Sequence, residues 1–331
     1  MFLPVCRVIA LGLFLGIAGC SSLRLESEFP GFVAIADDEP VELHKTPFFP
    51  QEAYQCGPAA LATVLTVAGA AVSPAELTPK IYLPARKGSL QVELIAGARR
   101  YGRLPYPIDP DPGALIAEIT AGRPVLVLQN LGFESYPVWH YAVVVGFDPI
   151  AEQFILRSGT EQRMLISVRR FLDTWQKADY WGLVVLRPGE LPVRAKEQIY
   201  LQSVAALEGS GQIEAAGLAY ITGLERWPNS TALRLGLGNV YYAQGKLAEA
   251  ARMFRELVER DPEDAVAYNN LAQVLAEQGC YEAALTAVGT ALSVGNTQDT
   301  LYPVFQQTRA EINNKQRNAG DYEYITAPIC R

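Results

Sequence analysis

Hydrophobic and polar positions divide the chain into three regions with different patterns. An uncharged, mostly apolar run covers residues 8–19. Residues 46–190 then mix short apolar runs, typical of buried strands, with amphipathic helical patterns. From residue 193 the strand pattern stops and the chain becomes helical and Ala-rich. The change follows the Pro- and Gly-containing stretch 187–192, which predicts a domain boundary there, with domains at 46–190 and 191–331.

The patterns of the first domain predict an α+β fold. Strands are expected at 124–130, 140–147, 153–158 and 182–187, and helices at 56–67, 89–101, 112–121 and 168–177. Strands and short helices that alternate in this way form one sheet with helices packed on it.

The second domain repeats with a period of 34 residues, which is the distance from Pro228 to Pro262. In the middle unit, small and large residues recur at Leu237-Gly238, Tyr241, Ala250, Phe254 and Pro262. This spacing resembles the tetratricopeptide repeat, in which small residues let two antiparallel helices approach closely. Three repeats over about 197–296 and a capping helix near 299–314 predict an all-α solenoid that binds a protein or peptide. An unrelated Ala-rich helical bundle is the alternative.

The amino terminus reads as an export signal. Twelve residues, 8–19, span only about 18 Å as a helix, against about 30 Å for a bilayer core. The sequence Ile17-Ala18-Gly19-Cys20 resembles the lipobox of bacterial lipoproteins, which implies a signal peptide at 1–19, lipidation of Cys20 and a tether at 20–45. Because Ser21 is not aspartate, we expect an outer-membrane lipoprotein that faces the periplasm. Inner-membrane retention, or a plain secretory signal with a chance cysteine, is the alternative.

Composition removes several function classes. The chain has 331 residues, of which 50% are hydrophobic and 19% charged, so it can bury two cores. Its 28 Lys and Arg against 35 Asp and Glu give a net charge of −7, which argues against nucleic-acid binding. The two histidines, His44 and His140, exclude a multi-histidine metal site. With no P-loop and no dinucleotide glycine fingerprint, we expect no cofactor.

Candidate chemistry centres on Cys56, which lies where an apolar helix begins and is followed by Pro58 in its first turn. Free amides and the dipole at a helix start favour a thiolate, so the cysteine pKa is expected to be low. The side-chain amide of Gln51 and the backbone N–H of Cys56 suit an oxyanion hole, with Gln55 as the rival glutamine. His140, which opens an apolar strand, is the candidate base.

Two sequence blocks carry a family resemblance. They are Gln51 with Cys56-Gly57-Pro58-Ala59-Ala60-Leu61, and His140-Tyr141-Ala142-Val143-Val144-Val145-Gly146-Phe147-Asp148. In order and spacing they resemble the papain-like clan, and more closely the double-glycine (bacteriocin-processing) peptidases. The resemblance spans roughly residues 46–165 and implies an α+β papain-like cysteine peptidase domain. It also implies that Cys56 is the nucleophile, His140 the general base and Gln51 the oxyanion donor.

At the third catalytic position this sequence departs from that family. Its members usually have an Asp, followed by Pro, at the end of the strand after the histidine strand. Asp148 lies eight extended residues from His140, about 26 Å away, and is expected to start a turn instead. If that turn closes a hairpin near residue 150, positions 158–160 face His140, and Ser158 takes the place of the aspartate. A hydroxyl orients the imidazole but carries no charge. Glu161, after a small register shift, is the lesser alternative.

Three functions fit these features. The first is a lipid-anchored periplasmic cysteine peptidase whose repeat domain recruits a protein substrate or partner. The second is a catalytically weak or inactive scaffold lipoprotein that binds proteins through both domains, and the third a related thiol acyl-transfer enzyme.

The remaining residues of interest are assigned no catalytic role. Cys6 leaves with the signal, and Cys280 and Cys330 are expected to pair in an oxidising periplasm. His44 reads as a tether residue, and Arg157 as either a substrate contact or a solvated cation. Aromatic residues that either line the cleft or belong to the core are Tyr54, Tyr136, Trp139 and Tyr141.

Overall fold

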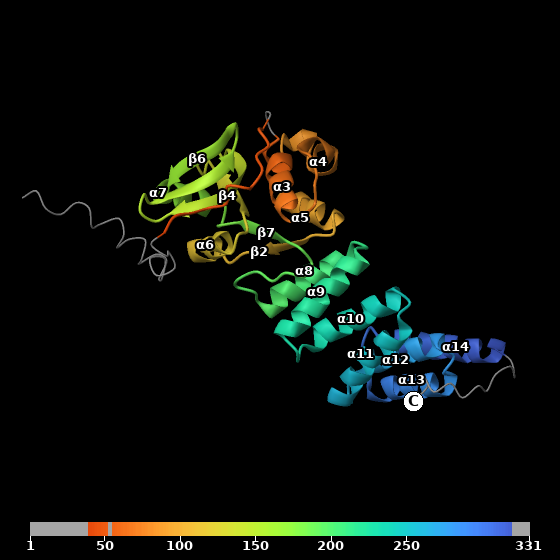
Figure 1. Cartoon of the computed structure of the whole chain (residues 1–331). Helices are drawn as coiled ribbons and strands as arrows, with labels where there is room; N and C mark the ends of the chain where they lie inside the picture. The colour runs from red at the N-terminus through yellow and green to blue at the C-terminus, as the bar shows by residue number, and fades with distance from the viewer. Residues whose placement is uncertain (1–38, 52–54, 320–331) are drawn as a thin grey trace, which may run out of the picture.

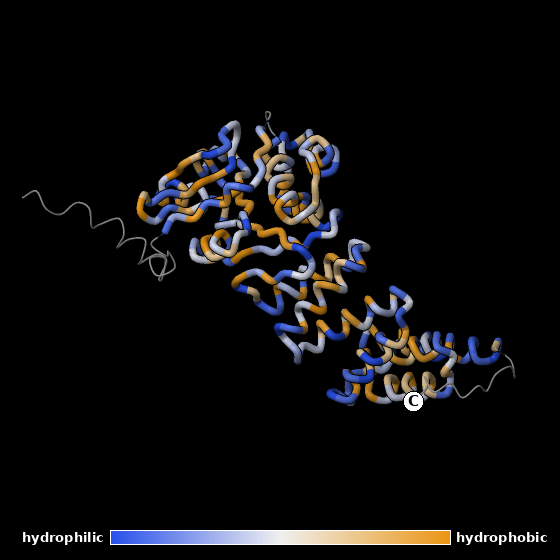
Figure 2. The backbone as a smooth tube through the Cα atoms, viewed as in Figure 1, coloured by the Kyte–Doolittle hydropathy of each residue, from blue (hydrophilic) through white to orange (hydrophobic). Residues whose placement is uncertain are grey.

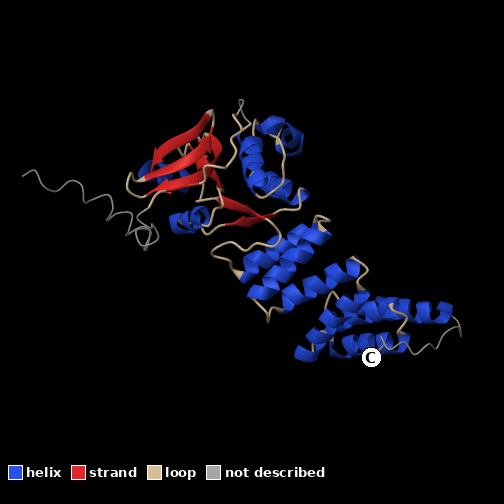
Figure 3. Cartoon of the chain, viewed as in Figure 1, coloured by secondary structure: helices blue, strands red, loops and turns tan. Residues whose placement is uncertain are grey.

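A computed structural model describes residues 39–51 and 55–319. An α+β domain comes first, and a run of helices follows it and extends away from the sheet (Figures 1 and 3). All strands of the described residues belong to the first domain. Among the same residues, no helix combines the length and the hydrophobicity needed to cross a bilayer. The segment with Cys20, residues 52–54 and Cys330 lie outside the described residues.

The first domain is built on one seven-stranded antiparallel sheet. The strand order is β2-β7-β3-β4-β5-β6, and β1 pairs with the C-terminal end of β4. The central strands β3 and β7 are buried along their whole length, as continuous apolar runs predict. The strands are β1 Val41–Glu42, β2 Leu104–Pro107, β3 Val125–Asn130, β4 Trp139–Asp148, β5 Gln153–Ser158, β6 Glu161–Ser167 and β7 Gly182–Leu186.

Helices cover both faces of this sheet. On one face, α3 (Cys56–Val67) packs against β3, β4 and β7 and is itself covered by α4 (Pro74–Ile81) and α5 (Gln91–Arg100), which explains why its residues are apolar on nearly every side. On the other face lie α6 (Pro112–Thr120) and α7 (Val168–Gln176). A short 3-10 helix at Pro84–Arg86 connects α4 to α5.

The second domain consists of antiparallel helix pairs. Fully buried Ala250 and Ala284 mark close approaches between neighbouring helices, and Phe254 fills the space beside them. Figure 2 shows hydrophobic residues along the inner sides of these helices and hydrophilic residues at many of their connections. The helices are α8 Glu197–Gly209, α9 Ile213–Arg226, α10 Thr231–Ala243, α11 Leu247–Arg260, α12 Ala265–Glu277, α13 Tyr281–Val294 and α14 Tyr302–Ala319.

The two domains share one continuous hydrophobic core. Tyr200 and Leu207 of α8 join the cluster that contains Leu104 of the edge strand β2. The connecting segment is also held by hydrogen bonds, since the Val193 N–H donates to buried Glu118 at 2.6 Å. The helical domain is therefore fixed at the β2 edge of the sheet. The expected boundary near residue 190 falls between β7 and α8.

Most predicted elements are confirmed, and the errors have physical reasons. The four strands, the four helices and the capping helix are present with ends shifted by a few residues. Strand β2 escaped prediction because Pro105 and Pro107 interrupt it, and an edge strand that pairs only with β7 tolerates them. Strand β6 was hidden because it is an edge strand that is mostly exposed. Strand β1 was missed because it has two residues, and α4 because Pro79 lies inside it.

Cys280 lies just before α13 and is buried and disulfide-bonded. Cys330 lies outside the described residues, so the pairing of Cys280 with Cys330 stays a prediction. The free cysteine of the described residues is Cys56.

Candidate active site

A cleft of about 830 Å³ brings the predicted catalytic residues together. Gln51, Cys56 and His140 all line it. One wall is the start of α3 with the loop that precedes α5, and the other is the start of β4 with the residues after α7. The remaining lining residues are Arg86, Lys87, Gly88, Ser89, Leu90, Gln91, Leu128, Pro137, Val138, Trp139, Tyr141, Ala178 and Asp179.

Cys56 is the first residue of α3, as the sequence predicts. The residue after it has to be small, because a Cβ on Gly57 would lie 2.6 Å from the Ser89 hydroxyl oxygen. Backbone N–H groups of Tyr141, Gly57 and Cys56 itself lower the thiol pKa, but burial outweighs them and raises the pKa of Cys56. The expectation of a lowered cysteine pKa is therefore wrong for this site, because burial exceeds the effect of the helix start.

His140 lies near the start of β4, and its Nε2 is 2.9 Å from the hydroxyl oxygen of Ser158. A β-bulge between Val144 and Gly146 shifts the register of β4 and β5 by one residue. The shifted register places Ser158 across from position 142, and therefore on the same face as His140. Without the bulge, Ser158 would lie across from position 143 and face the opposite side of the sheet.

The other two candidates for the third catalytic position lie elsewhere. Asp148 ends β4, and its carboxylate accepts the N–H groups of Ile150 and Ala151, which confirms the expected turn. Glu161 begins β6 and is exposed. Ser158 is thus the residue whose side chain contacts the imidazole.

Burial determines the charge state of the imidazole. It lowers the pKa of His140, so the ring is neutral at neutral pH. With the pKa of the Cys56 thiol raised and that of His140 lowered, the cleft favours a neutral thiol and a neutral imidazole at rest. Such a site works when the imidazole removes the thiol proton as the thiol attacks.

Gln51 is the glutamine that lines the cleft. Its backbone N–H donates to the carbonyl of Gly159 at 3.0 Å, which fixes it beside the end of β5 that carries Ser158. Gln55 directly precedes α3, its side chain makes no capping hydrogen bond, and it is not among the lining residues. The oxyanion role of Gln51 stays a prediction, as do the catalytic roles of the other three residues.

Sequence reasoning missed how the loop before α5 is held. The phenol of Tyr141 donates to the Ser89 carbonyl at 3.3 Å, and burial raises the pKa of Tyr141, so this donor stays protonated. The Ser89 hydroxyl is buried without a hydrogen-bond partner. Tyr141 and Trp139 line the cleft, as considered from the sequence. Only the position of Tyr141 directly after His140 could have signalled this role.

Arg157 matches neither function considered for it. Its side chain is buried and donates to the carbonyls of Thr46 and Gln162, at 3.4 Å and 2.6 Å. The guanidinium therefore ties the segment before Gln51 to the β5–β6 hairpin and does not reach the cleft.

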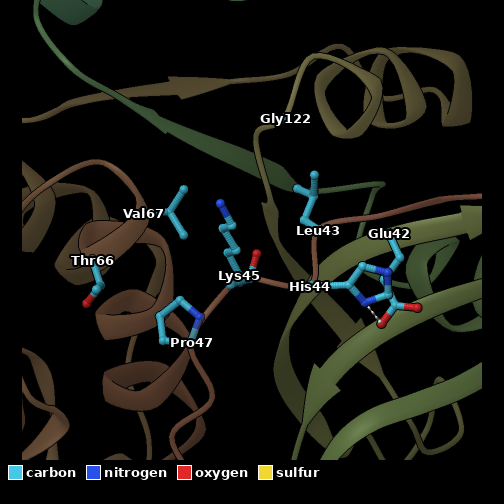
Figure 4. A pocket seen from close by; sticks show the side chains of 9 residues that line it. Glu42, Leu43, His44, Lys45, Pro47, Thr66, Val67 and Gly122 are labelled. Carbon is cyan, nitrogen blue, oxygen red and sulfur yellow. Dashed lines mark ion pairs between the residues drawn. The ribbon is translucent and has the colours of Figure 1, made fainter.

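His44 lies in a second pocket of about 560 Å³, near the opposite end of α3 from Cys56. Figure 4 shows its ring turned toward Glu42, with Nδ1 3.5 Å from Oε1, while Lys45 projects beside Val67. The His44 side chain is 78% exposed. Within the part of the chain that the structure describes, no three or more His, Cys, Asp or Glu side chains are grouped so as to hold a metal ion.

Comparison with known proteins identifies both parts of the chain. Residues 43–181 match the model of the Peptidase C39-like family, and residues 203–252 and 235–293 match the tetratricopeptide repeat. The chain therefore joins a C39-like peptidase domain to a tetratricopeptide-repeat domain. These matches confirm the expected fold class and the resemblance from which it came. No curated protein sequence matches the chain.

Solved structures resemble the first domain at low identity. A protein from Bacillus anthracis described as a C39-like peptidase is 17% identical, with a TM-score of 0.39, and the match covers 45% of this chain and 98% of that one. A double glycine motif protease from an AMS/PCAT transporter, in complex with its leader peptide, is 21% identical over 44% and 96%, with a TM-score of 0.33. The peptidase domain of Streptococcus ComA, a bifunctional ABC transporter of a quorum-sensing pathway, is 21% identical over 43% and 96%, with a TM-score of 0.34.

Proposed function

We propose that the chain is a cysteine peptidase that cleaves a polypeptide by nucleophilic attack of Cys56. The observation that carries the proposal is the contact of 2.9 Å between His140 and Ser158 in a cleft that Cys56 and Gln51 also line. In the tautomer with its proton on Nε2, the imidazole donates to this hydroxyl and leaves Nδ1 available to remove the thiol proton.

The reaction follows from these positions. The Cys56 sulfur attacks the peptide carbonyl as its proton passes to His140, and the oxyanion faces the Gln51 amide and the Cys56 N–H. Collapse of this intermediate breaks the C–N bond, and the imidazolium protonates the leaving amine. Water, deprotonated by His140, then hydrolyses the thioester and releases the acid.

We further propose that Cys20 carries a lipid anchor and that the protein faces the periplasm from the outer membrane. The sequence of residues 8–20 supports this proposal. The repeat domain recruits a protein substrate or partner, because repeats of this kind present an extended binding surface. It contributes none of the cleft-lining residues, so it acts on recruitment rather than on the chemistry.

A second candidate function is a scaffold lipoprotein with weak or no peptidase activity. The neutral hydroxyl of Ser158 favours it, because a hydroxyl stabilises an imidazolium less than a carboxylate does. A neutral thiol in the resting site points the same way.

Sequencing of newly formed peptide amino termini separates the two functions. Denatured bacterial extracytoplasmic protein is incubated with the full chain, with Cys56→Ala and with His140→Ala. We expect a set of new termini with the full chain that is absent with either variant. If the three samples yield the same termini, the peptidase function is wrong and the scaffold function remains.

A further inference from the structure

The connection between β3 and β4 carries an unusual cluster of exposed apolar side chains, which we call the apolar hairpin (residues 131–139). Outside these residues, no nine-residue stretch of the described chain exposes more than two large hydrophobic residues. The hairpin exposes five, at Leu131 52%, Phe133 78%, Tyr136 80%, Val138 51% and Trp139 53%. A concentration of this kind marks an interaction surface rather than ordinary scattered exposure.

Hydrogen bonds hold the apolar hairpin in one conformation. The side-chain oxygen of buried Asn130 accepts the N–H groups of Gly132 and Val138 at 3.0 and 2.9 Å. The N–H of Tyr136 donates to the Phe133 carbonyl at 3.1 Å and closes the tip. Because the backbone is already ordered, binding loses little conformational entropy there, which favours a docking role.

The apolar hairpin is continuous with the catalytic cleft. Pro137, Val138 and Trp139 belong to the hairpin and also line the cleft, directly before His140. Five extended residues separate His140 from the tip at Ser135, a distance of about 16 Å. An extended substrate covers that distance with about five residues of its own.

We propose that the apolar hairpin docks the substrate chain, and that the substrate is an extended polypeptide with a large apolar side chain within about five residues of the bond that Cys56 attacks. This inference rests on the proposed peptidase function. Glu134 is the single acidic residue of the hairpin, which has no Lys, Arg or His, so the surface selects apolar rather than charged side chains. Exposed aromatic residues also suit binding to a lipid surface. The Glu134 carboxylate and the net charge of −7 disfavour an anionic lipid surface as the partner of the hairpin.

Selection from a peptide library tests the docking surface without turnover. The full chain with Cys56→Ala is presented with random twelve-residue peptides, and the bound peptides are sequenced. The same selection is repeated with Phe133→Ser and Tyr136→Ser added together. The control variant carries Ile150→Ser instead, which removes a side chain of similar exposure (77%) from the β4–β5 turn. A further variant with Phe133→Leu and Tyr136→Leu keeps the surface apolar.

We expect Phe, Trp and Leu to be enriched with the Cys56→Ala chain, with the Ile150 control and with the leucine variant. The serine double variant should lose the enrichment and bind the selected peptides about tenfold more weakly or worse. No enrichment, or equal enrichment in all variants, overturns the proposal. It is also overturned if the serine variant keeps the peptides but loses binding to vesicles of phosphatidylglycerol and phosphatidylcholine.

The selected peptides separate failure of the docking surface from failure of the proposed function. If they bind through the hairpin and the full chain with Cys56 does not cleave them or any extracytoplasmic protein, the peptidase function fails and the docking surface stands. If Cys56-dependent cleavage occurs at the same rate in the serine double variant, the peptidase function stands and the docking surface fails.

Discussion

Replacing Ser158 changes a side chain that is in hydrogen-bond contact with the imidazole. The hydroxyl lies 2.9 Å from Nε2 of His140 and both donates and accepts hydrogen bonds, so it tolerates either imidazole tautomer. A carboxylate only accepts, and therefore holds the proton on Nε2 and leaves Nδ1 free for the thiol. We expect Ser158→Ala to weaken the site and Ser158→Asp to strengthen it.

The size of both effects follows from the charge on the imidazolium. A hydrogen bond to a charged group contributes about 1.5–3 kcal/mol, and one between neutral groups about 0.5–1.5 kcal/mol. Ser158→Ala therefore removes about 1–1.5 kcal/mol that is realised only after proton transfer, a rate loss of about five- to thirteenfold. A carboxylate beside the ring raises an imidazole pKa by about 1–3 units. In Ser158→Asp the charged pair of thiolate and imidazolium then becomes at least about tenfold more populated.

Alkylation of Cys56 measures this equilibrium without any substrate. Iodoacetamide reacts with the thiolate, and mass spectrometry of the peptide that contains Cys56 gives the rate at each pH. In the unmodified chain, burial raises the thiol pKa and lowers that of His140, so rapid alkylation is expected only at alkaline pH. Ser158→Asp should move the onset toward neutral pH, and Ser158→Ala should slow the reaction.

Ser167→Asp is the matched control, because it adds the same charge at the opposite end of the β5–β6 hairpin, where Ser167 pairs with Gln153. The control should leave the pH profile unchanged. If Ser158→Ala alkylates as fast as the unmodified chain throughout, or if both aspartate variants shift the profile equally, Ser158 does not position His140.

Three further predictions concern the same cleft. Gln51→Ala should lower kcat about 10²- to 10³-fold, the usual loss for an oxyanion-hole donor. Gln55→Ala should leave kcat within about twofold. If it does not, the assignment of Gln51 as the oxyanion donor fails. His140 must be neutral to act as the base, and burial lowers its pKa. As the pH falls, kcat/KM should therefore decline only below about 6.5, the ordinary imidazole pKa. A decline centred above that value contradicts the reasoning. Gly57→Ala should strongly reduce alkylation of Cys56, because the added carbon meets the Ser89 hydroxyl. Ser89→Gly in the same chain should restore alkylation. If it does not, the clash with Ser89 is not the cause of the loss.

The catalytic helix and strand could be predicted because their signals are local. An apolar run that starts at Cys56, with Pro58 in its first turn, predicts the helix start that the structure has. The hairpin between β4 and β5 could be placed because Asp148 begins its turn, and strand rise then put Ser158 near His140. These positions depend on residues within about twenty of one another, where periodicity and turn chemistry are informative.

The rest depends on contacts that no local pattern reveals. The bulge that brings Ser158 onto the face of His140 has one sequence signal, Gly146, whose missing side chain lets the Val41 carbonyl approach. The thiol pKa was misjudged because burial of Cys56 comes from the sheet and the loop before α5, more than thirty residues away in sequence. A longer separation, 52 residues, hid the contact between Tyr141 and Ser89.

The shared core determines how the repeat domain can influence cleavage. Helix α8 packs against the edge strand β2, and the Lys196 N–H just before it donates to the hydroxyl of buried Tyr106 at 3.0 Å. The cleft opens at the start of β4, three strands away from β2 in the sheet. Separating the domains would break these contacts and open the core that both domains share, so the repeats do not swing freely over the cleft. A partner bound to the repeats is therefore held at a fixed position relative to Cys56. A substrate that contacts both has to reach from the β2 edge of the sheet to the start of β4, which suits a chain with an extended segment, the kind that the apolar hairpin would dock.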